Sequence, residues 1–203
     1  MTRWYQEKKR EHFYKKAKKE GYRARSAYKL LQIQNKFHII QSGDVVVDLG
    51  AAPGGWSQVA HKLVQPNGLV VGVDISFIQP FQNIIFLQGD MTKEETIQTI
   101  LEAVDNKQVS VVLSDMSPDI SGNYSMDHAR SIYLCSKALK TAQHVLTKNG
   151  SFVCKVFMGD MLEEFVSEVK ESFRQVKQFS PKASRKSSSE QYIIARSYCG
   201  ENL

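Results

Sequence analysis

Apolar runs alternate with amphipathic stretches along the chain from residue 44 onward. Five runs rich in Val, Ile, Leu and Phe are typical of buried strands, at residues 45–49, 69–74, 84–87, 109–114 and 151–157. Between them, apolar residues recur at helical spacing, at residues 56–64, 93–104, 126–146 and 161–173. Strands that alternate with helices form a mostly parallel sheet covered on both faces, so the pattern predicts an α/β, Rossmann-like fold.

The last part of the chain departs from this alternation. Residues 175–179 and 191–198 are two strand patterns with only a loop, residues 180–190, between them. Because so short a connection joins antiparallel strands, we expect a seven-stranded sheet whose last strand runs against the others. The loop is rich in Ser and Lys, and we expect it to be mobile.

The length and composition fit one globular domain. The chain has 203 residues, of which 42% are apolar and 24% charged, enough for one α/β domain with a full core. No apolar stretch is long enough to span a membrane, and the charged N-terminus is unlike a signal peptide. The cysteines Cys135, Cys154 and Cys199 form no paired motif, which favours reduced thiols and a cytoplasmic location.

The first 29 residues stand apart by charge. They hold eleven basic residues against three acidic ones, a net +8, more than the +6 of the whole chain. Aromatic residues are interleaved with the basic ones, at Trp4, Tyr5, Phe13, Tyr14, Tyr22 and Tyr28. This mixture suits phosphate contact and base stacking on RNA, although a solvated helix whose aromatics pack on the domain would have the same pattern. We therefore separate a basic RNA-binding arm, residues 1–25, from a larger domain, residues 26–203.

A glycine-rich segment, "DLGAAPGGW", follows the first strand and opens the first helix of the alternating region. Glycines at this place let the backbone approach a nucleotide-type ligand closely. The spacing Gly50-x-x-x-Gly54-Gly55 is not the G-x-G-x-x-G of dinucleotide enzymes, which disfavours a dehydrogenase. No Gly-Lys-Ser/Thr follows, so the segment is not a phosphate loop either.

Acidic residues at strand ends narrow the choice of ligand. Asp48, Asp74, Asp90 and Asp115 each fall at or just after the end of a strand, where ligands bind in such sheets. Four carboxylates would repel a polyphosphate, whereas Asp74 could hold a ribose diol, and the N-terminus of the first helix, after Gly54-Gly55, could hold a carboxylate. S-adenosylmethionine has a ribose, a carboxylate and positive charge, so the pattern favours it as the cofactor.

The strand at residues 151–157 contains a lysine among apolar residues. Lysine is almost never buried unless it is paired or used, so Lys155 is a candidate functional residue that would point to the same edge as Asp115. The alternative is an edge-strand lysine whose amine reaches solvent. The segment Asp115-Met116-Ser117-Pro118 lacks the aromatic residue that methylases of base amines carry there, which argues against base methylation.

Several stretches together resemble one known family. They are "RARSAYKL" at 23–30, "VVDLGAAPGGWSQ" at 46–58, "LQGDMT" at 87–92, "LSDMSPDISG" at 113–122, "GSFVCKVFMG" at 150–159 and "SRKSSSEQYIIA" at 184–195. Through them the chain resembles the FtsJ/RrmJ-like family of ribose 2′-O-methyltransferases nearly end to end. The resemblance implies a methyltransferase domain over residues 26–203 and S-adenosyl-L-methionine as the cofactor.

The resemblance also assigns residues to roles. The family's catalytic Lys-Asp-Lys-Glu tetrad falls on Lys29, Asp115, Lys155 and Glu190. The candidate cofactor-binding residues are Asp48, Gly50, Pro53, Gly54, Gly55, Trp56, Asp74, Asp90, Met91 and Asp115. From their own patterns Lys29 and Glu190 would be ordinary exposed residues, so their roles rest on the resemblance alone.

Within the family, the pattern is nearest to enzymes that modify a uridine of large-subunit ribosomal RNA. We therefore expect 2′-O-methylation of a ribose, with ribosomal RNA or the large ribosomal subunit as partner and with no metal or membrane involved. The ribose hydroxyl must lose its proton, and Lys155 is the expected base. The alternatives are the related branch that acts on tRNA, an RNA-binding protein that has lost catalysis, and a methyltransferase for a small molecule or a protein.

Overall fold

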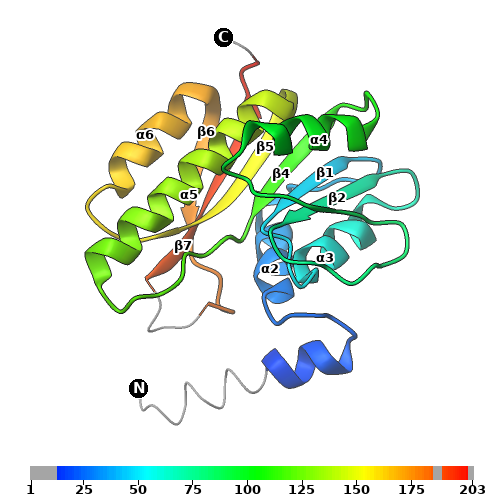
Figure 1. Cartoon of the computed structure of the whole chain (residues 1–203), viewed down its shortest axis with the longest axis horizontal. Helices are drawn as coiled ribbons and strands as arrows, with labels where there is room; N and C mark the ends of the chain where they lie inside the picture. The colour runs from blue at the N-terminus through cyan, green and yellow to red at the C-terminus, as the bar shows by residue number, and fades with distance from the viewer. Residues whose placement is uncertain (1–12, 185–188, 201–203) are drawn as a thin grey trace.

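The central sheet has seven strands in the order β3-β2-β1-β4-β5-β7-β6 (Figure 1). The computed structural model describes residues 13–184 and 189–200. The strands are β1 (Val45–Leu49), β2 (Leu69–Asp74), β3 (Ile85–Gln88), β4 (Val109–Ser114), β5 (Leu146–Phe157), β6 (Phe173–Phe179) and β7 (Glu190–Tyr198). Strands β1 to β5 pair in parallel, and β7 pairs antiparallel with both β5 and β6. The predicted α/β fold with a reversed last strand is confirmed.

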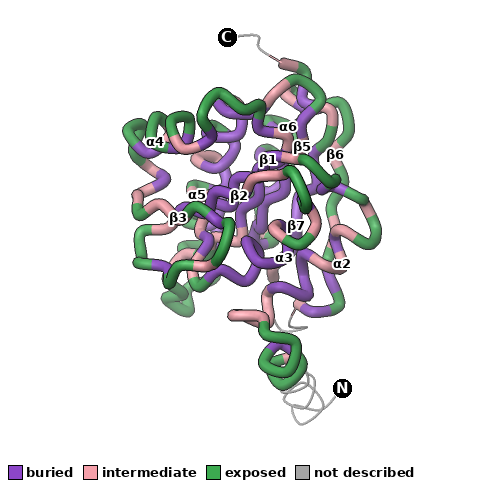
Figure 2. Tube along the Cα trace, turned by 90° about the vertical axis from the view of Figure 1, so that its right-hand side faces the viewer, coloured by how far each residue is buried: buried purple, intermediate pink, exposed green. Residues whose placement is uncertain are grey.

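Helices cover both faces of this sheet, and the alternation of side chains along the strands explains how. The helices α2 (Ala27–Phe37) and α3 (Gly55–Val64) pack on one face, and α4 (Glu94–Val104), α5 (Tyr124–Val145) and α6 (Leu162–Ser172) on the other. Along β1, Val45, Val47 and Leu49 belong to the core beneath α4, α5 and α6, while Val46 belongs to the core beneath α2 and α3. The buried part of the trace accordingly lies in the strands and in the helix faces turned toward them (Figure 2).

Some element boundaries differ from the predicted ones. Strand β5 begins at Leu146, directly after α5, rather than at residue 151. Leu146 pairs with Val109, and the register then shifts so that Ser151 pairs with Val111. Residues 147–150, which are polar, form this irregularity. Because they interrupt the apolar pattern, the sequence placed the start of the strand at residue 151. Smaller shifts move β3 one residue later, to Ile85–Gln88, and begin β6 two residues earlier, at Phe173.

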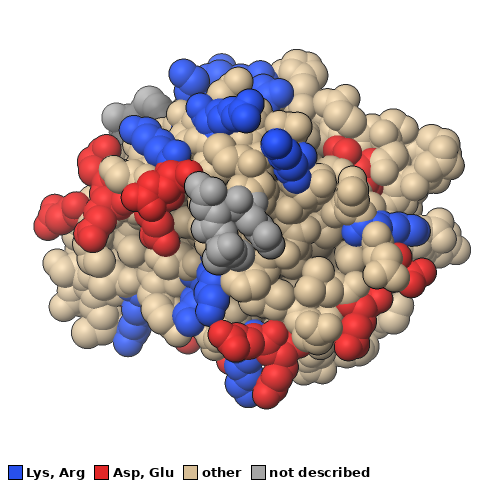
Figure 3. All heavy atoms as spheres, turned by 90° about the horizontal axis from the view of Figure 1, so that it is seen from above, with Lys and Arg blue, Asp and Glu red and all other residues tan. Residues whose placement is uncertain are grey.

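The carboxyl ends of the parallel strands lie at the lower edge of the sheet in Figure 1, where β7 begins. A helical segment, residues 13–19, projects below this edge and is mostly exposed (Figure 2). The opposite face of the molecule carries basic and acidic side chains interspersed with one another (Figure 3). Within the described residues, no helix has the length and apolar character needed to cross a membrane.

Candidate active site

The pairing of β5 with β7 brings the first catalytic candidates together. Lys155 lies in β5 directly opposite Tyr192 of β7, and Phe157 lies opposite Glu190. Asp115 follows β4, the neighbour of β5 on its other side. Strand β5 is therefore interior, and Lys155 is only 7% exposed. A charged side chain at such a place requires partners, and it has them.

Asp115 provides both partners of the Lys155 amine. The Nζ of Lys155 donates a hydrogen bond to the backbone carbonyl of Asp115 at 2.6 Å and lies 3.2 Å from its carboxylate Oδ1. The same Oδ1 accepts a hydrogen bond from the hydroxyl of Tyr192 at 2.6 Å. These contacts fix the amine and the carboxylate relative to each other before any substrate binds.

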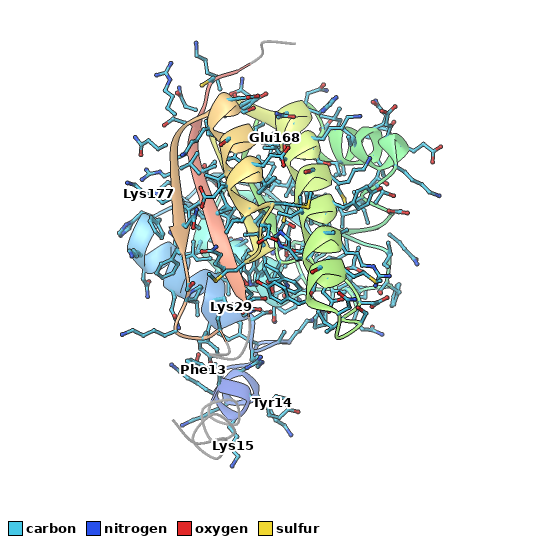
Figure 4. All side chains as sticks on the ribbon, turned by 90° about the vertical axis from the view of Figure 1, so that its left-hand side faces the viewer. Phe13, Tyr14, Lys15, Lys29, Glu168 and Lys177 are labelled. Atoms are coloured by element: carbon cyan, nitrogen blue, oxygen red, sulfur yellow. The ribbon has the colours of Figure 1, made fainter. Side chains whose placement is uncertain are left out.

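Lys29 and Glu190 form the other half of the cluster. The Nζ of Lys29 lies 2.7 Å from Oε1 of Glu190 and 4.0 Å from Oδ1 of Asp115. Lys29 stands on the first turn of α2, beside the start of β7 (Figure 4). Burial alone would raise the pKa of Glu190, but the charge and hydrogen bond of Lys29 outweigh it, so the pKa lies below its ordinary value.

The structure therefore corrects two expectations drawn from local pattern. Lys29 was expected on the solvated side of its helix, yet the residue is only 7% exposed. Glu190 was expected to be exposed at the start of its strand, yet its side chain is only 12% exposed. Both are buried because each neutralises the other, a pairing across 161 residues that no local pattern contains.

Tyr192 belongs to this cluster and was missed in the sequence. Its ring stacks on Trp56 with 5.6 Å between the ring centroids, and the Nζ of Lys29 lies 5.7 Å from the Tyr192 ring centroid. Burial, reinforced by the charges of Asp115 and Glu190, raises the pKa of Tyr192 well above its ordinary value, so the phenol stays a donor to Asp115. The signal in the sequence was that Tyr192 lies two residues after Glu190, which places both side chains on one face of a strand.

The glycine-rich loop lies next to the ends of β1 and β2. Asp74 ends β2, and its two carboxylate oxygens accept hydrogen bonds from the backbone N–H groups of Ala52 and Ser76. Gly50 and Gly54 have positive φ angles of 71° and 107°. A Cβ on Gly50 would lie 2.3 Å from Cγ of Met116, the residue after Asp115, so glycine lets the loop approach the β4 end.

Asp48 lies near the end of β1, as its next-to-last residue, and it is fully buried. Its Oδ2 accepts a hydrogen bond from the Ser57 hydroxyl of α3 at 2.6 Å, and its Oδ1 is a buried acceptor without a hydrogen-bond partner. Burial, with smaller contributions from Asp115 and Asp74, raises the pKa of Asp48 to about 7, against the opposing effect of Ser57.

The remaining cofactor candidates lie on the loop after β3 and at the start of α3. Asp90 accepts two hydrogen bonds on Oδ1, from the backbone N–H and the hydroxyl of Thr92, and these lower its pKa. Met91 is buried in the core beneath α4 and α5. Gly55 and Trp56 begin α3, where the first backbone N–H groups of a helix have no partner within the helix.

Comparisons with known proteins identify the family of the chain. A family model described as FtsJ-like methyltransferase matches residues 22–198. The chain belongs to the FtsJ-like methyltransferase family. It is 54% identical over 187 residues to the "Ribosomal RNA large subunit methyltransferase E" of Methanothrix thermoacetophila, covering 92% of this chain and 72% of that one.

Two further comparisons place this FtsJ-like methyltransferase among relatives with similar names. The protein of the same name from Acinetobacter baylyi is 48% identical over 193 residues, covering 95% of this chain and 89% of that one. A crystal structure of a Plasmodium falciparum chain described as a ribosomal RNA methyltransferase superposes with a TM-score of 0.81 at 25% identity, covering 89% of this chain and all of that one. The predicted family and the predicted class of enzyme, a methyltransferase, are confirmed.

A short segment of the FtsJ-like methyltransferase ties the N-terminal region to the glycine-rich loop. The guanidinium of Arg23 donates hydrogen bonds to the backbone carbonyls of Pro53, Gln79 and Pro80, at 3.3, 2.6 and 2.9 Å. The Gln58 side chain of α3 accepts from the backbone N–H of Arg23 and donates to the carbonyl of Gly21. We call residues 21–26 the clamp segment.

The aromatics of the N-terminal region mostly pack on the protein. The rings of Phe13 and Tyr22 lie 5.4 and 5.8 Å from the ring of Tyr28, which is itself buried. Tyr14 is 62% exposed and points away from the body together with Lys15 (Figure 4). Trp4 and Tyr5 lie outside the described residues. Of the described aromatics expected to stack on bases, the structure therefore presents Tyr14 to solvent and packs the other three.

The loop between β6 and β7 is only partly described. Residues 185–188 lie outside the described part of the chain. Before them, Ala183 is buried against Tyr28, and its backbone N–H donates a hydrogen bond to the Gln32 side chain of α2 at 3.3 Å. This end of the loop, expected to be mobile, is packed on α2.

Proposed function

We propose that this enzyme transfers a methyl group from S-adenosylmethionine to the ribose 2′-oxygen of a nucleotide in large-subunit ribosomal RNA. The observation that carries the proposal is the buried cluster of Lys155, Asp115, Lys29 and Glu190 beside the glycine-rich loop. The names of the relatives support the choice of RNA. A uridine as the target and a cytoplasmic location remain part of the proposal.

The residues of the cofactor region fit S-adenosylmethionine. Asp74 accepts one hydrogen bond on each carboxylate oxygen, which leaves lone pairs on both for the two hydroxyls of a ribose. The start of α3 at Gly55 and Trp56 suits a carboxylate. Asp48 has a buried oxygen without a partner, which suits a nearby positive charge. Bound S-adenosylmethionine supplies a methyl group on a sulfonium, which is an excellent leaving group.

The catalytic cluster then has to position the ribose hydroxyl and remove its proton. Lys155 acts in this proposal as a neutral amine, which has two N–H donors and one lone pair. The carbonyl and the Oδ1 of Asp115 can take the two donors, which leaves the lone pair to accept the proton of the ribose hydroxyl. Lys155 accepts the proton as a general base, a role that typically accelerates a reaction about 10²–10⁴-fold.

The other members of the cluster position these groups. Lys29 brings a positive charge near the developing alkoxide, and Glu190 holds Lys29 in place at 2.7 Å. Tyr192 holds the Asp115 carboxylate through a hydrogen bond. No strong acid is required at the leaving group, because the sulfur departs as a neutral thioether. Alignment of the hydroxyl by this fixed cluster contributes the rest of the rate.

The proposal is tested by offering several RNAs in parallel. Labelled methyl transfer from S-adenosylmethionine is measured with large ribosomal subunits, free large-subunit ribosomal RNA and tRNA, all from cells that lack this modification. We expect label in large-subunit RNA, supplied free or in subunits, and none in tRNA. Label in tRNA alone would move the protein to the tRNA branch, and label in none of them would reject an RNA substrate.

A further inference from the structure

A cleft of about 450 Å³ opens beside the catalytic cluster and has no part in the chemistry described above. Its lining includes Arg25, Tyr124, His128, Ser189 and Glu190. Glu190 is thus shared between the cleft and the cluster, because its carboxylate also holds Lys29. The volume falls within the range of small-molecule sites, about 300–1,000 Å³.

Exposed apolar side chains are frequent in the two segments that border this cleft. Among the described residues, eleven large hydrophobic side chains are exposed, and five of them lie in two short segments beside the cleft: Ile120, Tyr124, Met126, Met158 and Met161. The hydroxyl of Tyr124 joins the two segments by donating to the backbone carbonyl of Met158 at 2.6 Å. Exposed apolar residues that gather in one place often mark a binding site, whereas single exposed ones do not.

The framework that carries Tyr124 is fixed by hydrogen bonds on both sides. Asn123 caps α5 by accepting from the backbone N–H of Met126. Asp127 accepts from the Ser121 hydroxyl and from the N–H groups of Ser121 and Gly122.

The segment after β5 is fixed by His128, which uses both ring nitrogens, one with the carbonyl of Phe157 and one with the N–H of Met161. The Tyr124 ring, 59% exposed, is therefore held in one place by its own hydroxyl.

We infer that Tyr124 is the platform on which the base of the target nucleotide stacks while its ribose lies at Lys155. The inference rests on the proposed function. A base is covalently attached to the ribose, so it must lie within a few ångströms of the cluster, and the cleft is continuous with the cluster through Glu190. A fixed aromatic ring with an exposed face suits an unstacked RNA base.

The other lining residues suit the same occupant. Arg25 brings a positive charge to the cleft, which complements the phosphates on either side of the nucleotide. Ser117 and Ser189 line the cleft with polar groups that can contact the edge of a base. A protein partner would use the apolar rim but would gain nothing from closeness to Glu190.

The test compares variants of two tyrosines on the same helix. Tyr133 is also exposed, at 53%, but lies outside the cleft lining, so Tyr133→Ala is the matched control. We expect Tyr124→Ala to lower kcat/KM for free large-subunit ribosomal RNA by about 5- to 140-fold, the equivalent of roughly 1–3 kcal/mol of stacking. Tyr124→Phe keeps the ring but loses the hydrogen bond that holds it, so its kcat/KM should lie between those of Tyr124→Ala and the wild type. Affinity for S-adenosylmethionine should be unchanged in all three.

Several outcomes would overturn the inference. They are equal rates for Tyr124→Ala and Tyr133→Ala, or a loss in Tyr124→Phe as large as in Tyr124→Ala. A loss seen with assembled subunits but absent with free RNA would assign the surface to a ribosomal protein instead.

A second measurement does not depend on catalysis. Tyr124→Trp and Tyr133→Trp each place an indole reporter on α5, and oligouridylate is titrated while the fluorescence is followed. Stacking on position 124 predicts quenching in the first variant and not in the second, and equal responses would contradict it. If the wild type labels no ribosomal RNA but the first reporter is still quenched, only the proposed reaction fails.

Discussion

Lys155 is held between two oxygens of a single residue, Asp115, and this arrangement accounts for a lysine in the middle of a buried strand. In the proposed reaction this amine takes the proton of the ribose hydroxyl and does not contact the cofactor. Loss of the Lys155 amine should therefore slow methyl transfer to the hydroxyl without weakening the binding of S-adenosylmethionine.

We predict that Lys155→Ala lowers the single-turnover rate of methyl transfer by about 10²–10⁴-fold, because a positioned general base is lost. The dissociation constant for S-adenosylmethionine, measured by calorimetry, should stay within a few-fold. Lys177→Ala, which changes an exposed lysine of β6 (Figure 4), is the matched control and should behave as the wild type. A near-normal rate in Lys155→Ala would remove the base from the mechanism.

Asp48 gives a prediction about stability and pH. Its pKa is about 7 in the folded protein and about 3.8 in an ordinary environment, so between these values the folded state holds a proton that the unfolded state has released. The free energy of unfolding should therefore fall as the pH rises from about 4 to 7, and this contribution should level off above pH 7. The Asp48→Asn variant has no ionisable group at this position, so its free energy of unfolding lacks this fall with pH.

We predict that the difference in unfolding free energy between Asp48→Asn and the wild type shifts in favour of the variant by about 1–4 kcal/mol from pH 5 to pH 8. Urea unfolding of the cofactor-free protein at several pH values measures it. A difference that stays constant over this range would show that Asp48 is ionised in the folded state throughout.

At the residue scale, the sequence predicted those site residues that differ in character from their neighbours in the chain or that stand at the end of a strand. Lys155 stands out because its immediate neighbours are apolar, and Asp74 because it ends a strand. Lys29 and Glu190 do not stand out, since the partner that buries each of them comes from the far end of the chain. Arg23 and Tyr192 were missed for the same reason, because their partners belong to other elements.

At the scale of elements, the clamp segment connects the N-terminal region with the glycine-rich loop. Arg23 binds three backbone carbonyls, one on the glycine-rich loop at Pro53 and two on the loop after β2. Trp56, which stacks on Tyr192, donates its indole N–H to the carbonyl of Ser26. The glycine-rich loop is thus held by the last residues of the predicted basic arm, residues 1–25, and by Ser26.

We predict that Arg23→Ala weakens binding of S-adenosylmethionine by about 10-fold or more, because hydrogen bonds from a charged donor typically contribute about 1.5–3 kcal/mol. Arg23→Lys keeps the charge but loses the forked set of guanidinium donors. Its affinity for S-adenosylmethionine should lie between those of the wild type and Arg23→Ala. Calorimetry measures both, with Arg174→Ala on the exposed side of β6 as the control. Unchanged affinity in Arg23→Ala would mean that the loop keeps its shape without the clamp.

The elements themselves were largely predictable, because buried parallel strands have a simple apolar signature and each is followed by a helical period. The reversed direction of β7 followed from the shortness of the loop before it. The start of β5 was missed because its first residues are polar and bulge out of the pairing with β4. What the pattern could not provide is the β5–β7 register, which decides that Lys155 faces Tyr192.

At the scale of the whole molecule, the cluster and the cleft include residues where β4 and β5 end and where β7 begins. The helical segment at residues 13–19 projects below this same edge of the sheet (Figure 1). We propose that this segment is part of a basic arm that guides RNA to the cluster. Lys18 and Lys19 are exposed on it. A single domain offers little surface for reading a long sequence, so RNA shape and ribosomal context are expected to set specificity.

We predict that the double substitution Lys18→Ala and Lys19→Ala weakens RNA binding and flattens the dependence of log affinity on log salt. The slope should fall by roughly 0.7–0.9 for each RNA phosphate that a lysine no longer neutralises. Cofactor affinity should not change. Filter binding over a range of salt concentrations measures the slope, and Lys148→Ala, which changes an exposed lysine near the amino end of β5, is the control. An equal slope in the variant and the wild type would make the segment a solvated helix only.

Alkaline hydrolysis of the labelled RNA shows whether the methyl group has gone to a ribose oxygen. Alkali cleaves RNA through the 2′-hydroxyl, so a 2′-O-methyl group blocks cleavage at that nucleotide. With wild-type enzyme and large-subunit ribosomal RNA, we predict that the label appears in dinucleotides. Label released in mononucleotides would show methylation of a base and would contradict the account.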